Sequence, residues 1–222
     1  MVKLKFIFDK EYDKATANNM LFTKRYTQED IENMDSLYCA SDKVLKKTQK
    51  MYQKTWDRVN DDFFKLIKKI TGYDWAFDNY ECVISVINPG ASNQGNSNRI
   101  LLWWRMNPYY LMRIVGHELV LHHYQHILRR YYSKEKLNDG QLWALSETAA
   151  YTLTSLPKEI QKLWPWHINY MGNHMSGMGY PQLDEIRLKL KEPFLKRKNF
   201  DDYIMKGIKL IKKYSKIGVI KK

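Results

Sequence analysis

The chain has 222 residues, of which 44% are hydrophobic and 14% aromatic, so general disorder is excluded and a domain with a sizeable core is expected. Its 37 Lys and Arg against 24 Asp and Glu give a formal net charge of +13, which permits contact with nucleic acid, acidic lipid or an acidic protein. No stretch of about eighteen apolar residues occurs, and lysines interrupt the N-terminal segment, so we expect a cytoplasmic protein without a signal peptide and without membrane contact.

The N-terminal part of the chain predicts a strand and two helices. Hydrophobic and polar residues alternate over Val2–Phe8, which is typical of a strand with one buried face. Thr27 is a candidate N-cap for a short helix, and a long helix is predicted from Ser41 to Gly72. The positions that recur at three- and four-residue steps along that helix, and that we expect to form its buried face, are Val44, Thr48, Met51, Tyr52, Thr55, Trp56, Val59, Phe63, Leu66, Ile67 and Ile70.

Two further strands are predicted over Tyr80–Ile87 and Arg99–Arg105, because both runs are rich in β-branched and aromatic residues. The connection 88–98 reads NPGASNQGNSN, which is turn chemistry throughout, and its glycines match no phosphate-binding fingerprint. We therefore expect a surface loop here. The strand Arg99–Arg105 is expected to lie beside a substrate cleft, where an edge strand can pair with an extended peptide.

Helices are predicted for the rest of the chain. Asn107 and Pro108 suit a helix start, and that helix runs to about Tyr132. A second helix spans Gln141–Leu156, capped by Asn138 or Asp139 and ended by Pro157. Beyond a turn of helix at 158–163 and an irregular stretch at 164–180, two basic helices follow, the first begun by Pro181 and interrupted at Pro193, the second capped by Asn199. The fold class expected is α+β, mostly helical with a small sheet, with residues 1–180 as one domain and the basic helices of residues 181–222 against it.

The helix after Pro108 contains the run GHELVLHHYQH, with four of the six histidines of the chain. Two His at positions i and i+4 of a helix can bind one zinc ion, with a Glu beside the first His. Here the partner of His117 is His122, at i+5, roughly 140° away around a regular helix. The pair converges if a π-bulge inserts one residue between Glu118 and His122.

The run HELVLH resembles the H-E-x-x-G-H motif of the dipeptidyl peptidase III family of zinc peptidases, in which a Glu of a following E-x-x-A-E helix is the third ligand. Glu147 and Ala150 match that second pattern, whereas Leu121 stands in place of the Gly and Tyr151 in place of the trailing acid. The resemblance covers about forty residues, and in layout the chain resembles a compact zincin of the gluzincin type. It implies a small sheet, a metal-binding helix and then a glutamate helix.

The resemblance implies a Zn²⁺ ion held by His117, His122 and Glu147, with a water in the fourth position and Glu118 as the general base. The expected function is a zinc metallopeptidase that hydrolyses peptide bonds of a peptide or protein. A donor to the developing oxyanion is also needed, and we expect His174, with Tyr170 and Tyr151 as alternatives.

Two alternatives stay open. Glu118, His122 and His126 follow a four-residue step, so on a regular helix these three residues share a face and could hold the metal without a bulge. His123 is expected at the surface or behind a ligand. The chain could also be a non-catalytic zincin-like protein, or a basic helical module whose residues 181–222, with thirteen Lys and Arg against five Asp and Glu, contact nucleic acid or an acidic partner.

Overall fold

The computed structural model describes the chain except residues 20–26, 89, 94–96, 166–180 and 218–222. The chain folds into two compact units. The first comprises Met1–Asp62 and Phe77–Glu118, and the second comprises Phe63–Ala76 and Leu119–Lys222. The basic C-terminal helices belong to the second unit together with the glutamate helix.

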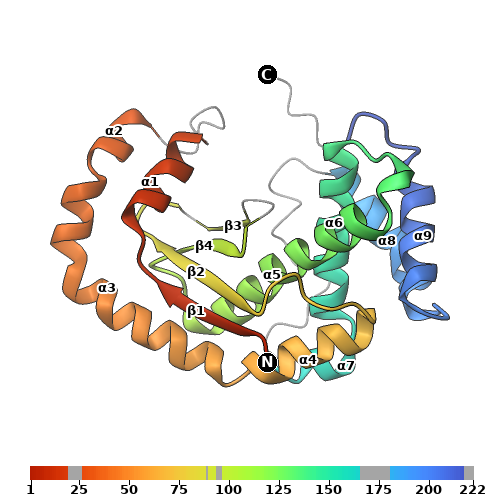
Figure 1. The fold of residues 1–222 in the computed structure, drawn as a ribbon, viewed down its shortest axis with the longest axis horizontal. Helices are drawn as coiled ribbons and strands as arrows, with labels where there is room; N and C mark the ends of the chain where they lie inside the picture. The colour runs from red at the N-terminus through yellow and green to blue at the C-terminus, as the bar shows by residue number, and fades with distance from the viewer. Residues whose placement is uncertain (20–26, 89, 94–96, 166–180, 218–222) are drawn as a thin grey trace. The chain divides into compact units, whose positions relative to one another are not determined.

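Four strands of the described residues form one sheet in the order β1-β2-β4-β3 (Figure 1). The strands β1 (Lys3–Ile7), β2 (Asn79–Ser85) and β4 (Arg99–Trp103) run parallel, and β3 (Ala91–Asn93) runs antiparallel to β4. The chain is thus α+β with a small sheet, and the three predicted strands are confirmed to within two residues at their ends.

The connection predicted as a loop contains β3, which the turn-rich composition of NPGASNQGNSN hid. Because of this strand, the free edge of the sheet is not where the sequence predicted it. β4 pairs with β2 on one side and with β3 on the other, so the strand predicted to receive a peptide is interior, and β3 is the edge instead.

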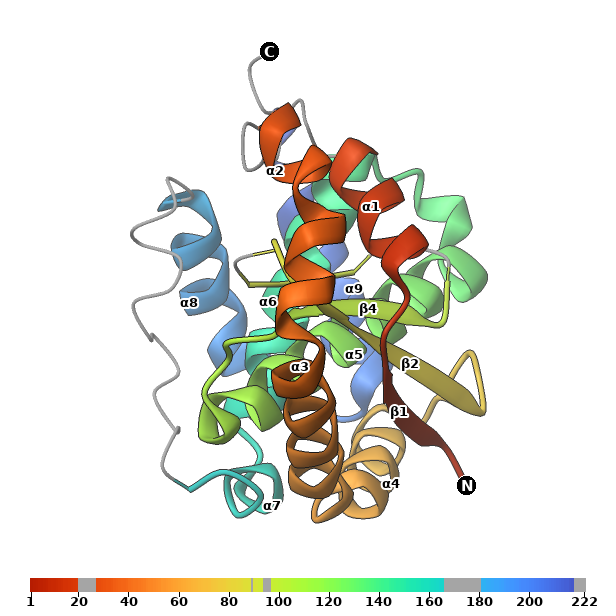
Figure 2. The same cartoon turned by 90° about the vertical axis from the view of Figure 1, so that its left-hand side faces the viewer.

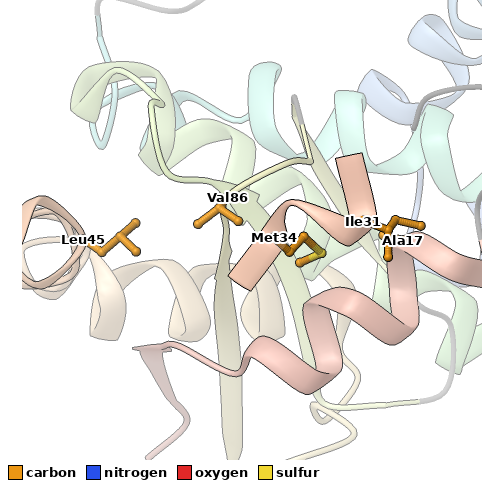
Figure 3. Packing of buried hydrophobic residues seen from close by; sticks show 5 residues of the cluster. All are labelled: Ala17, Ile31, Met34, Leu45 and Val86. Carbon is orange, nitrogen blue, oxygen red and sulfur yellow. The ribbon is translucent and has the colours of Figure 1, made fainter. Parts of the chain in front are cut away.

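The first unit contains α1 (Lys10–Asn19), α2 (Gln28–Glu32) and α3 (Met34–Asp57). The predicted N-cap Thr27 is confirmed, because its side chain accepts from the amide of Asp30 in a capping box. Apolar side chains of these helices and of the end of β2 form one core cluster (Figure 3). The buried members of the cluster are Ala17, Ile31, Met34, Leu45 and Val86.

The single long helix predicted from Ser41 to Gly72 is two helices, α3 and α4 (Asn60–Thr71). No Gly or Pro marks the break, so the sequence pattern missed it. Gly72 does end α4, with a φ of 77° that favours glycine. The predicted buried face is also partly wrong: Tyr52 and Trp56 are fully buried, but Val44 and Met51 are 52% and 42% exposed.

Helix α3 runs along the outer edge of β1 (Figure 1), where amide side chains bond the backbone that a neighbouring strand would otherwise bond. Gln53 accepts from the amide of Phe6 at 2.9 Å and donates to the carbonyl of Leu4 at 3.1 Å. Gln49 donates to the carbonyl of Phe6, and Asn60 accepts from the amide of Leu4. One edge of the sheet is therefore closed by helix side chains.

The second unit is helical. It contains α6 (Asp139–Ser155), α7 (Lys158–Gln161), α8 (Pro181–Leu195) and α9 (Phe200–Ile211), and a 3-10 turn at Ser133–Glu135. Helices α8 and α9 both pack against α6 and against each other (Figure 1).

The helix starts of the second unit agree with two of the predicted caps. Asn138 accepts from the amide of Gln141, and Asn199 accepts from the amide of Asp202. The interruption predicted at Pro193 is wrong, because α8 continues through Pro193 to Leu195. None of the described helices has the length and apolarity that crossing a bilayer requires.

Candidate functional site

The histidine run lies on α5 (Pro108–Tyr131), which follows β4 directly in the chain. The predicted start is confirmed: Pro108 is the first helical residue, and the Asn107 side chain accepts from the amide of Tyr109 at 2.9 Å. Most side chains of α5 between residues 111 and 128 are buried. A helix buried on nearly all sides needs few polar residues, so the four imidazoles and the one carboxylate here call for a chemical explanation.

His117 and Glu118 are half-buried and therefore retain solvent access, whereas the flanking Val115 and Leu119 are fully buried. On the sheet, Cys82 of β2 is fully buried, and this burial raises the pKa of its thiol. The Glu118 carboxylate raises that pKa further. In the first unit, Glu118 thus lies within electrostatic reach of the sheet and is also accessible to water.

Helix α5 is α-helical from Pro108 to Tyr131, with no π-helical turn between Glu118 and His122. The backbone irregularity that would bring His117 and His122 together is therefore absent from this helix. At about 100° per residue, the two imidazoles start from positions roughly 140° apart around the axis.

His122 is 4% exposed, and burial lowers the pKa of its imidazole to about 4. Two positive neighbours on the same helix, His126 and Arg129, lower that pKa further. The second unit therefore holds His122 as a neutral imidazole at pH 7, which is the form that a metal ion binds. His126 lies four residues after His122 on this regular helix, so the two imidazoles share a face of α5, as the four-residue step predicted.

His123 is fully buried, so the expectation of a surface position is wrong. Its ring stacks on Trp75 with 4.4 Å between the centroids, and its Nε2 lies 3.3 Å from the Thr71 hydroxyl. That hydroxyl donates to the carbonyl of Ile67, so the imidazole Nε2–H must be the donor to Thr71. Nδ1 is buried and has no hydrogen-bond partner in the described structure. His123 is a structural residue of the second unit, and burial lowers its pKa to about 3.

Glu147, the candidate third ligand, lies on α6 and is half-buried. The indole of Trp143 donates to its Oε1 at 3.1 Å, one helical turn earlier. One turn later, Tyr151 is 6% exposed and carries the guanidinium of Arg187 over its ring at 4.4 Å. Sequence reasoning missed Trp143, although its four-residue spacing from Glu147 was a usable signal. No local pattern pointed to Arg187, since it comes from α8.

Among the described residues, no three side chains of His, Cys, Asp or Glu are grouped so that they could hold a metal ion. This holds for His117, His122 and Glu147, and for the alternative set that includes Glu118 and His126. The donor types suit zinc, and His122 is neutral, but neither set is assembled. His174 and Tyr170, the expected oxyanion donors, lie outside the described residues. The ligand set and the base stay predictions.

Four lysines in or directly after the basic C-terminal helices form ion pairs with Asp or Glu. The pairs are Lys189–Glu185, Lys196–Glu192, Lys206–Asp202 and Lys212–Glu135. Lys209, Lys213 and Lys216 are exposed and have no acidic partner in the part of the chain that the structure describes. The expected basic surface is therefore smaller than the sequence count suggests.

Comparison with known proteins gave no match: no family model fits the chain, and no curated protein or solved structure resembles it.

Proposed function

We propose that this chain is a zinc-dependent metallopeptidase of zincin-like fold. The observation that carries the proposal is the half-buried pair His117 and Glu118 on α5, a helix that is mostly buried between residues 111 and 128 and that directly follows a mostly parallel sheet. A solvent-accessible imidazole and carboxylate on such a helix occupy positions that apolar side chains could fill. A chemical role for His117 and Glu118 explains why these positions are polar.

Two ligand sets are compatible with the proposal. The first is His117, His122 and Glu147, which requires α5 to rewind locally between Glu118 and His122 when the metal binds. The second is Glu118, His122 and His126, whose four-residue spacing needs no bulge. In the first set His117 is a ligand and Glu118 is the base, whereas in the second set Glu118 is a ligand and His117 has no role. Substitution of these residues can therefore distinguish the two sets.

Zinc, when bound, makes a water molecule acidic enough to act as a nucleophile near neutral pH. In the first ligand set, the Glu118 carboxylate accepts the proton of the attacking water and later passes it to the leaving amine. The neutral imidazole of His122 is ready to bind without losing a proton. The indole of Trp143 fixes the Glu147 carboxylate.

An extended peptide substrate is proposed to add to the sheet at β3. This strand is an edge and runs antiparallel to β4, so its outer backbone groups can pair with an incoming strand. The opposite edge, β1, is closed by Gln53 and Asn60. The edge predicted from sequence was β4, and the proposal moves the contact one strand outward.

Metal analysis of the purified protein tests the ligands. We expect close to one zinc per chain in the wild type. If the first set is right, the metal is lost in His117→Ala, His122→Ala and Glu147→Gln but retained in His126→Ala. Retention in His117→Ala together with loss in His126→Ala would assign the second set, and a wild type without zinc would refute the proposal.

Hydrolysis of a quenched fluorescent peptide library tests the base. Glu118→Gln should retain zinc and lose activity, by a factor of roughly 10² to 10⁴ for a general base. Activity that survives in Glu118→Gln would remove Glu118 from that role. Zinc without hydrolysis in the wild type would favour the non-catalytic zincin-like alternative.

A further inference from the structure

Helix α3 has an outward face that its own unit does not cover. Three of its aliphatic side chains are exposed: Leu37 by 38%, Val44 by 52% and Met51 by 42%. They are spaced by seven residues, and seven steps of about 100° return to within about 20° of the starting direction. The three side chains, here called the aliphatic row, therefore form a nearly straight line along α3.

Four exposed lysines flank the aliphatic row on one side. They are Lys43, Lys47, Lys50 and Lys54, here called the lysine ridge. By the same helical geometry, they project roughly 60° to 120° from the aliphatic row, all in the same sense. None of the four has an acidic partner among the residues that the structure describes.

None of the three carboxylates of α3 forms an ion pair with the lysine ridge among the described residues. Asp35 pairs with Lys10 at 3.0 Å, and Asp42 pairs with Lys46 at 2.8 Å. Asp57 accepts from the amide of Gln53 at 2.7 Å. The outward face of α3 therefore combines exposed aliphatic groups with uncompensated positive charge.

We propose that this face of α3 binds the surface of an anionic lipid bilayer. A basic helix with exposed aliphatic side chains binds such a surface through apolar burial and attraction to the headgroups. In Figure 2, α3 lies in front of the sheet with this side of the first unit toward the viewer. The expectation of no membrane contact rested on the lack of a spanning segment, and peripheral binding needs none.

Two other occupants fit the face less well. A second copy of the chain would bring one lysine ridge against another, and like charges oppose that contact. A partner helix usually lays its apolar side into a groove. The aliphatic row is one side chain wide and protrudes from a convex helix, so it offers no groove to a partner helix. A bilayer surface can adapt to such a protrusion. The proposal is independent of the peptidase activity.

Flotation with vesicles tests the proposal, with phosphatidylcholine alone compared to phosphatidylcholine mixed with phosphatidylserine. We expect binding only to the mixed vesicles, and binding should weaken with added salt. Val44→Ser/Met51→Ser should lower the partition coefficient about fivefold or more, since it removes exposed apolar area without emptying a core position. Lys47→Gln/Lys50→Gln should lower it roughly tenfold.

The matched control is Lys209→Gln/Lys213→Gln, with Lys209 on α9 and Lys213 two residues beyond its end, which removes the same charge elsewhere. Because the chain is strongly basic, it could bind anionic vesicles through its net charge alone. In that case the partition coefficient would fall equally in the control and in Lys47→Gln/Lys50→Gln, and this result overturns the proposal. Absence of binding to the mixed vesicles, or unchanged binding of Val44→Ser/Met51→Ser, overturns it as well. Circular dichroism checks that each variant is folded.

A probe on α3 reports the contact directly. The protein carries a bimane dye on Val44→Cys in a Cys39→Ser background, since Cys82 is buried and unreactive. We expect a blue shift of the dye with the mixed vesicles and none with phosphatidylcholine alone. An unshifted dye on vesicle-bound protein, or a shift that appears without lipid as the protein dimerises, overturns the proposal.

Discussion

The buried imidazole of His123 makes the second unit sensitive to acid. In the native state its Nε2–H donates to Thr71, and its Nδ1 lies buried with no acceptor among the described groups. Protonation would place a charge at Nδ1 inside an aromatic environment next to Trp75. Burial, with His126 and His122 adding positive potential, therefore lowers the pKa of His123 to about 3 from an ordinary value of 6.5.

The sign of the pH effect follows from proton counting. Between pH 6.5 and pH 3 the unfolded chain binds a proton at His123 that the native state does not, so acid favours unfolding. The stability is fully present above pH 6.5 and falls by about 1.4 kcal/mol per pH unit for one such group. His122, with its pKa lowered to about 4, adds a second proton over the upper part of the same window.

The substitution His123→Phe keeps a planar ring against Trp75 and removes the titrating group. We expect the free energy of unfolding, measured by urea denaturation in the presence of a metal chelator, to fall less steeply below pH 6.5 than in the wild type. The slope should decrease by about 1.4 kcal/mol per pH unit between pH 6 and pH 4. His117→Gln, at a half-buried position of the first unit, is the control, because it leaves His122, His123 and His126 in place. An unchanged slope in His123→Phe would refute the assignment of a neutral buried imidazole.

Substitutions at three further positions test the fold that carries the site. Burial raises the pKa of Asp13, so its native state keeps a proton that the unfolded chain has lost, and this stability disappears as pH rises through the folded pKa. Asp13→Asn should therefore raise the free energy of unfolding at pH 7, whereas Asp13→Ala, which removes the acceptor of the buried Val86 amide and of the half-buried Tyr38 hydroxyl, should lower it by about 1–3 kcal/mol. Gln53→Leu should cost about 1–3 kcal/mol in urea denaturation and speed hydrogen exchange at the amide of Phe6. Gly140→Ala should lower the thermal midpoint, because a Cβ there would lie 1.9 Å from the carbonyl oxygen of Ile217.

Matched variants make these three predictions refutable. A decrease in stability for Asp13→Asn as large as that for Asp13→Ala would show that the charge itself is required. Gln53→Glu retains the acceptor for Phe6 and should slow its exchange relative to Gln53→Leu. Gly207→Ala, whose Cβ would meet a flexible leucine side-chain methyl at 3.2 Å, should be milder than Gly140→Ala. The reverse order would contradict the close approach at Gly140.

Elements with strong local signals were predictable from sequence. The alternation in Val2–Phe8, the caps at Thr27 and Asn199, and the Asn107-Pro108 start each depend on residues within a few positions of one another. Local chemistry determines such features. The α+β class follows from them, since they specify both strands and helices.

Features that depend on distant parts of the chain were not predictable. The break between α3 and α4 places Asn60 where its side chain bonds the backbone of Leu4 in β1 and of Val2 just before it, at separations of 56 and 58 residues. The burial of Leu45 instead of Val44 depends on which side of α3 meets the sheet. Strand β3 is three residues long and gains its structure from pairing with β4. Periodicity along one helix contains no information about these partners.

In the candidate site, too, features set by local sequence were predictable and features set by distant residues were not. The sequence identified the helix that carries His117 and Glu118, because an His-Glu pair followed by further histidines is a local pattern. It did not distinguish His123, a core residue, from its neighbour His122, because both imidazoles occupy adjacent positions. Their difference comes from Trp75 and Thr71, some fifty residues away.

The closure of β1 by α3 has a consequence for the growing chain during synthesis. The residues that bond the outer edge of β1, from Gln49 to Asn60, leave the ribosome before β2, which begins at Asn79. At about 5–20 residues per second, this order gives α3 roughly one to four seconds to cover that edge before the partner strand begins to emerge. A nascent chain can thus shield one side of its first strand from other nascent chains before its sheet exists.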